Sequence, residues 1–156
     1  GAGSIKTAEW AAKHGMNLQS STLVNKESNE PFHIQQAKQL IAYKKAFKEA
    51  GHNFKPRTLV TRSIQPITTD LDRKLFAGSM WDEDSVGYLS YHQNPTIFGK
   101  TFAGEPDVIA KELAQDEAIK EADTLLITIP NTLGVEYNVH LLESIVKDVA
   151  PLVGWR

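Results

Sequence analysis

The chain has 156 residues with a formal net charge of −2, and 41% of its residues are hydrophobic while 23% are charged. These proportions are typical of a globular chain with a buried core, and they exclude a disordered one. Acidic and basic residues are interspersed, which excludes a basic surface for nucleic acid or membrane lipid. The sequence has no cysteine and no long apolar run, so we expect a cytoplasmic protein without disulfides or membrane spans.

The first part of the chain predicts a helix, a short strand and a second helix. Ser4 can cap a helix over residues 5–14, which Gly15 ends. The segment MNLQSSTL is β-compatible, and a polar loop follows it. A helix over residues 33–50 carries its apolar residues on one stripe and ends at Gly51.

The middle of the chain predicts a strand, a short helix and an irregular segment. TLVTRSIQPI is rich in β-branched residues and predicts a strand closed by Pro66. TDLDRKLFAG predicts a short helix capped by Thr69 or Asp70. SMWDEDSVGYLSYHQNPTIFGK mixes aromatic residues with turn residues, so we expect an irregular excursion there.

The last part of the chain predicts a helix, a strand and a final helix. GEPDVIAKELAQDEAIKEA predicts a helix with Pro106 in its first turn. DTLLITIP is apolar almost throughout, which is typical of a parallel strand covered by helices on both faces. The final helix should end before Pro151. Its apolar stripe has the members Val135, Val139, Leu142, Val146 and Val149.

This alternation of helices and strands predicts an α/β fold with parallel strands. Only three segments are convincing strands, and three parallel strands would leave two edges with unpaired backbone groups. We therefore expect an incomplete sheet of about three parallel strands with flanking helices.

The chain opens on a glycine-rich turn made of Gly1, Ala2, Gly3 and Ser4. Such a turn at the start of a helix can hold a phosphate, because backbone N–H groups approach the anion and the helix dipole favours negative charge. Lys6 stands where a dinucleotide-binding fingerprint would need glycine. The alternative is that these four residues are a remnant of cloning.

Three stretches that span nearly the whole chain resemble a known family. They are GAGSIKTAEWAAKHGMNLQSSTL, PFHIQQAKQLIAYKKAFKEAGHNFKPRTLVTRSI and FAGEPDVIAKELAQDEAIKEADTLLITIPNTLGVEYNVHLLESIVKDVAPLVGW. In their order along the chain and in their amino-acid sequence, they resemble the C-terminal half of the bacterial luciferase-like monooxygenases, which are flavin-dependent (β/α)8 TIM barrels. The resemblance implies that residues 1–156 are a single partial barrel domain. The first strands and the catalytic residues they carry would then lie outside this chain.

The resemblance implies that the turn Gly1–Ser4 helps to hold the phosphate of FMN. Arg62, in the strand closed by Pro66, could meet a phosphate or an anionic substrate, or form a salt bridge within the barrel. Ser20 and Ser21 follow a short strand where barrel enzymes place substrate-side groups, and ordinary loop capping is their alternative. Trp81 could line the substrate pocket or simply cover the barrel end.

The activity implied is oxygenation of a small organic substrate with O₂, using reduced FMN that a flavin reductase supplies. A deazaflavin-dependent oxidoreductase, a non-catalytic flavin-binding protein and an interaction module without ligand are the alternatives. The five histidines show neither HxH nor HExxH spacing, so we expect no metal site. Three strands cannot close a barrel, so we expect this half to be inactive alone. We expect it to form a homo-oligomer or to pair with a missing N-terminal half.

Overall fold

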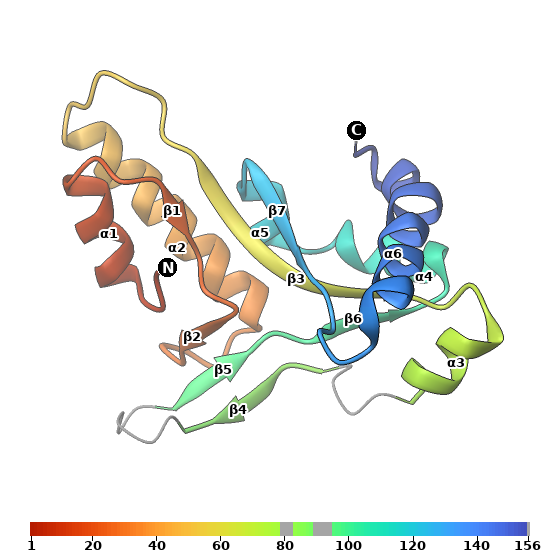
Figure 1. Cartoon of the computed structure of the whole chain (residues 1–156). Coiled ribbons are helices and arrows are strands. Elements are labelled where there is room, and N and C mark those ends of the chain that lie inside the picture. The colour runs from red at the N-terminus through yellow and green to blue at the C-terminus, as the bar shows by residue number, and fades with distance from the viewer. Residues whose placement is uncertain (79–82, 89–94, 156) are drawn as a thin grey trace. The chain divides into compact units, whose positions relative to one another are not determined.

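The computed structural model describes residues 1–78, 83–88 and 95–155, which form an α/β structure with parallel strands (Figure 1). The chain divides into two compact units. Unit 1 consists of Gly1–Thr61, Asp84–Gly99 and Asp116–Leu126. Unit 2 consists of Arg62–Glu83, Lys100–Gln115 and Ile127–Arg156.

The helices of unit 1 are α1 (Ile5–Lys13), α2 (Phe32–Glu49) and α5 (Glu117–Glu121). The predicted cap is confirmed, because the Ser4 side chain accepts a hydrogen bond from the Thr7 N–H at the start of α1. Gly15 and Gly51 follow α1 and α2 in the left-handed conformation, with φ of 65° and 72°. Both predicted stops are therefore confirmed.

The core of unit 1 lies where α1, α2 and α5 meet the strands. Small residues of α1 allow α2 to approach closely, and Tyr43 of α2 is fully buried there. Its hydroxyl donates to the Met16 carbonyl at 2.5 Å, which satisfies the polar end of the ring. The buried members of this core include Ala8, Ala12, Leu18, Leu40, Tyr43, Phe47, Val60 and Ala118.

One sheet contains the parallel strands of the chain. Its members are β1 (Leu18–Gln19), β3 (Thr58–Pro66), β6 (Thr101–Gly104) and β7 (Thr124–Thr128). β1 pairs in parallel with the start of β3, β6 pairs in parallel with its end, and β7 also pairs with β3. The sequence did not predict β6, because a four-residue strand that ends in glycine has little alternation to detect. Within the described residues these strands do not close into a barrel.

A second, antiparallel sheet belongs to unit 1. Its strands are β2 (Leu23–Asn25), β5 (Thr96–Phe98) and β4 (Ser85–Gly87), in that order. The segment expected to be irregular therefore supplies two strands. Val24, Phe32 and Ile97 form the core beneath it. A Cβ at Gly99 would lie 2.5 Å from the Phe32 ring, so this position requires glycine.

The helices of unit 2 are α3 (Asp70–Phe76), α4 (Pro106–Leu113) and α6 (Gly134–Ser144). Thr69 caps α3, as predicted. The helix predicted from Pro106 onward is broken, because Asp116 starts the separate helix α5 by accepting from the Ile119 N–H at 3.0 Å. α6 continues into the π-turn η1 (Ile145–Val149) and the 3₁₀ turn η2 (Ala150–Val153).

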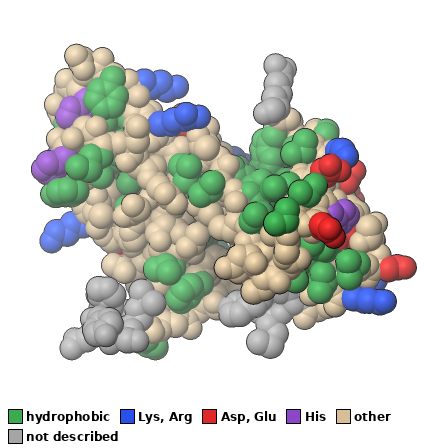
Figure 2. Space-filling model, in the orientation of Figure 1, with side chains coloured by type: hydrophobic (Ala, Val, Ile, Leu, Met, Phe, Trp, Pro, Cys, Tyr) green, Lys and Arg blue, Asp and Glu red, His purple; other side chains and the backbone are tan. Residues whose placement is uncertain are grey.

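The apolar stripe predicted for the final helix is wrong for most of its members. Val135, Val139, Leu142 and Val146 are exposed, and only Val149 of the predicted set is buried. The buried face of α6 and η1 carries Leu141, Ser144, Ile145 and Val149 instead. Figure 2 shows hydrophobic side chains gathered over α6. The helix is apolar on two faces, so periodicity alone could not choose the buried one. Among the described residues, no helix is long and apolar enough to cross a membrane.

Candidate functional site

The turn Gly1–Ser4 is built into unit 1. Ala2 is only 1% exposed and forms a parallel bridge with Ser20, just past the end of β1. Its N–H donates to the Gln19 carbonyl at 2.8 Å, and its own carbonyl accepts from the Ser21 N–H at 3.0 Å. Ala2 thus takes the place of a strand end, and the chain passes directly from it into α1. This is the strand-to-helix turn that phosphate sites use.

The backbone donors of this turn fit an anion. The Ala8 N–H makes the first intrahelical hydrogen bond, to the Ser4 carbonyl at 3.1 Å. The Thr7 N–H donates to the Ser4 hydroxyl. Within the described residues, the N–H groups of positions 3–6 donate to no acceptor. The first turn of α1 carries no acidic side chain. The N-terminus of α1 therefore presents several donors and the positive end of a helix dipole.

Ser20 and Ser21, the predicted pocket residues, contact α2. The buried Ser20 hydroxyl donates to Gln39 Oε1 at 2.7 Å. The Ser21 carbonyl accepts from Gln36 Nε2 at 2.7 Å. These contacts tie the end of β1 to α2, and a role in substrate binding stays a prediction.

Arg62 and Trp81 are the remaining predicted site residues. Arg62 lies in β3 and is 3% exposed, and its carbonyl is 3.5 Å from the Thr128 hydroxyl. Strand alternation places Arg62 on the same face of β3 as the fully buried Ile64. A role for Arg62 in phosphate binding stays a prediction. Trp81 lies outside the described residues.

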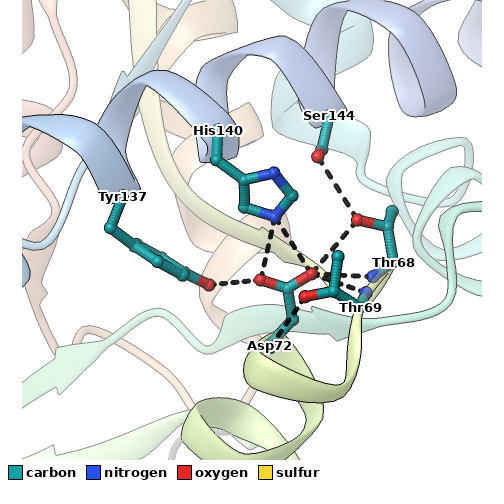
Figure 3. A network of polar contacts seen from close by, with 6 residues as sticks. All are labelled: Thr68, Thr69, Asp72, Tyr137, His140 and Ser144. Carbon is teal, nitrogen blue, oxygen red and sulfur yellow. Dashed lines mark hydrogen bonds and ion pairs between the residues drawn. The ribbon is translucent and has the colours of Figure 1, made fainter.

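A buried carboxylate in unit 2 was not among the predicted site residues. The side chain of Asp72 in α3 is 1% exposed. It accepts from Tyr137 at 2.6 Å and contacts His140 Nε2 at 3.0 and 3.1 Å (Figure 3). It also accepts from the Thr68 and Thr69 N–H groups at 3.0 and 2.8 Å. We call these five residues the Asp72 cluster.

Local structure explains why these side chains converge. Thr69 and Asp72 form a capping box, in which each side chain bonds the backbone N–H of the other residue. Tyr137 and His140 are three positions apart on α6 and therefore lie on one face of that helix. The Ser144 hydroxyl extends the cluster through Thr68 Oγ1 at 3.4 Å (Figure 3).

The cluster fixes the charge states of Asp72 and Tyr137. Burial by itself raises the pKa of Asp72, but hydrogen bonds from Tyr137, His140 and Thr69 together hold this pKa well below its usual range. Burial and the hydrogen bond to Asp72 raise the pKa of Tyr137 well above its usual range. Asp72 is therefore ionised at neutral pH and Tyr137 is neutral. Because an ionised carboxylate only accepts hydrogen bonds, His140 carries a hydrogen on Nε2.

A cavity of about 660 Å³ lies beside the cluster in unit 2. Its lining residues are Thr69, Leu71, Leu75, Leu133, Glu136, Tyr137 and His140. The His140 side chain is 35% exposed, so the imidazole is reachable although its carboxylate partner is buried. A carboxylate that orients an accessible imidazole is an arrangement suited to proton transfer. The same contacts also join α3 to α6.

Local sequence signals for the cluster exist, but they do not reveal that its parts meet. Thr69 and Asp72 have the spacing of a capping box, and Tyr137 and His140 have helical spacing. Asp72 and His140 are 68 positions apart, and no local pattern links them.

No protein-family model matches the chain, and no curated protein matches it significantly.

Proposed function

We propose that this chain is the C-terminal part of a luciferase-like (β/α)8 barrel that uses FMN to oxygenate a small organic substrate with O₂. In this proposal the turn Gly1–Ser4 holds the FMN phosphate. The observation that carries the proposal is the strand-like pairing of Ala2 with Ser20, directly before a helix whose first N–H groups are unpaired among the described residues. The sequence resemblance supplies the identity of the cofactor.

The order of the parallel strands supports a barrel origin. Ala2 pairs beside β1, β1 pairs with β3, and β3 pairs with β7. α1 separates Ala2 from β1 and α2 separates β1 from β3, as helices alternate with strands in (β/α)8 barrels, while β6, which also pairs with β3, lies between β3 and β7 in the chain. A doubly wound dinucleotide-binding sheet would reverse its strand order instead.

The donors of the turn match what a phosphate monoester needs. The N–H groups of positions 3–6 and the Ser4 hydroxyl would hold the phosphate oxygens, and the dipole of α1 would favour their charge. When bound, reduced FMN would supply the activation of O₂. The chain's own residues would bind and orient the cofactor.

The test compares FMN with riboflavin, which lacks the phosphate. Titrating the chain with each flavin and following flavin fluorescence should give at least about tenfold tighter binding of FMN at low salt. Ser4→Asp should remove this preference, because aspartate still caps a helix but repels the phosphate. Ser4→Thr keeps a hydroxyl and should preserve the preference. Equal affinities for FMN and riboflavin, or no flavin binding at all, would overturn the proposal.

A further inference from the structure

A small cavity of about 240 Å³ in unit 2 is lined by β3 and β7 at or near their carboxyl ends and by the first residue of β6. Its lining residues are Ser63, Gln65, Phe76, Thr101, Thr128, Ile129 and Pro130. Ser63 and Gln65 come from β3, Thr101 from β6 and Thr128 from β7. Ligands of parallel α/β folds bind beyond the carboxyl ends of the strands, so the position suits a binding site.

Gln65 lines this cavity with a carboxamide whose oxygen has no hydrogen-bond partner among the described residues. It is 6% exposed, and its Oε1 is buried and accepts no hydrogen bond within the described residues. The neighbouring hydroxyls of Ser63 and Thr128 are joined to each other at 2.5 Å. An unsatisfied buried amide destabilises a protein, so its presence calls for an explanation.

Two other carboxamides with a buried, unpaired oxygen differ from Gln65, because each still donates a hydrogen bond through its nitrogen. Gln36 and Asn138 also have an unpaired side-chain oxygen, but their amide nitrogens donate to the carbonyls of Ser21 and Pro130. The carboxamide of Gln65 makes no corresponding hydrogen bond to the described residues.

The cavity defines the chemistry of its ligand. None of the described residues that line the cavity is charged, and Phe76, Ile129 and Pro130 supply apolar walls, which favours an uncharged ring. A volume of about 240 Å³ is below the roughly 300–1,000 Å³ of pockets that hold whole drug-sized ligands. It suits a small molecule or one end of a larger one. A carboxamide presents an acceptor beside a donor, and its complement is a ring N–H beside a ring C=O.

We propose that this cavity binds the cis-amide edge of a planar heterocycle, with Gln65 forming two parallel hydrogen bonds to that edge. A lactam or imide substrate carries such an edge, and so does the pyrimidine ring of a flavin. Only the second source rests on the proposed function. The binding chemistry of Gln65 is the same for both.

The experiment uses the full chain with three probes that lack a phosphate: riboflavin, its N3-methyl derivative and uracil. The methyl group removes the ring N–H that would face Gln65 Oε1. We expect riboflavin to bind about tenfold more tightly than the N3-methyl derivative. Gln65→Met, which keeps the side-chain volume, should abolish this discrimination and raise the midpoint of thermal unfolding. Gln36→Met deletes a buried carboxamide elsewhere and should keep the discrimination.

The outcomes separate this inference from the proposed function. Binding of uracil that Gln65→Met abolishes, without flavin binding, would support the inference and overturn the proposed function. Phosphate-dependent FMN binding, with N3-methylriboflavin bound as tightly as riboflavin, would overturn the inference and leave the proposed function standing. Failure of all three probes to bind, or equal binding by wild type and Gln65→Met, would also overturn the inference.

Discussion

The carboxylate of Asp72 and the imidazole of His140 lie 3.0 Å apart, although 68 positions separate the two residues in the sequence. Asp72 belongs to the helix after β3 and His140 to the helix after β7, so one buried charge joins two helices of unit 2. The carboxylate also completes the capping box of α3. Local helix stability and the packing of α3 on α6 therefore depend on the same side chain.

We expect Asp72→Asn to lower the free energy of unfolding by about 3–5 kcal/mol, because it leaves several buried donors without a charged acceptor. Denaturant unfolding followed by circular dichroism measures this loss. Asp70→Asn is the matched control, since Asp70 stands at the exposed start of the same helix and should cost less than about 1 kcal/mol. Similar losses in the two variants would contradict a special role for Asp72.

Acid should remove the stabilisation that Asp72 provides. The hydrogen bonds of the cluster outweigh burial and hold the pKa of Asp72 well below its usual range in the folded state. Its contribution is therefore fully present above the unfolded pKa of about 3.9 and is lost as the pH falls from there toward the folded pKa. The gap in unfolding free energy between wild type and Asp72→Asn should shrink over that window. A gap that is constant between neutral pH and strongly acidic pH would contradict the assignment.

Alkali should act on the cluster through Tyr137. Burial, with the hydrogen bond and charge of Asp72, raises the pKa of this phenol. Its contribution to stability is present below the unfolded pKa of about 10 and is lost as the pH rises toward the folded pKa. Burial also raises the pKa of Tyr43, so a spectrophotometric titration of tyrosinate should show more than one late-ionising tyrosine, and Tyr137→Phe should remove one of them. Loss of a tyrosine that ionises near pH 10 would contradict this prediction.

The elements that were predictable from sequence have local causes. Ser4 caps α1 and Gly15 ends it, and Gly15 is required because its φ is 65°. β3 ends at Pro66, as its β-branched residues and the proline indicate. Each of these signals lies within a few residues of the feature it predicts.

The features that were missed depend on partners far along the chain. The face that α6 buries is chosen by packing in unit 2, and the sequence offers two apolar faces. β5 pairs with β2 and β6 pairs with β3, and both partners are distant in the sequence; the short strand β4 pairs with β5. The Asp72 cluster combines two ordinary helical spacings that meet only in the folded chain.

Ser20→Ala should act mainly on stability. The variant leaves Gln39 Oε1 buried without its 2.7 Å donor, which should cost about 1–3 kcal/mol. The double variant Ser20→Ala/Gln39→Leu removes both partners and should recover part of this loss, so a double-mutant cycle measures the interaction. A large loss of ligand affinity in Ser20→Ala with unchanged stability would favour the predicted role in the substrate pocket.

Self-association should depend on the exposed stripe of α6. Val135, Val139, Leu142 and Val146 follow one another at spacings of four, three and four, and their side chains are 80%, 51%, 41% and 66% exposed. A contiguous apolar face of this kind is typical of an interaction surface. We expect the chain to sediment as a homo-oligomer, and we expect Val139→Lys with Val146→Lys to shift it to monomer.

The matched control for this prediction is Ile41→Lys on α2. Ile41 is 52% exposed and lies outside the α6 stripe, so its replacement adds a charge at a similarly exposed apolar position. Because Ile41 is not part of the α6 stripe, the control should leave the oligomer intact. Sedimentation velocity over a dilution series distinguishes the cases. A wild-type chain that stays monomeric at high concentration would contradict the prediction, and so would equal dissociation by both sets of lysine variants.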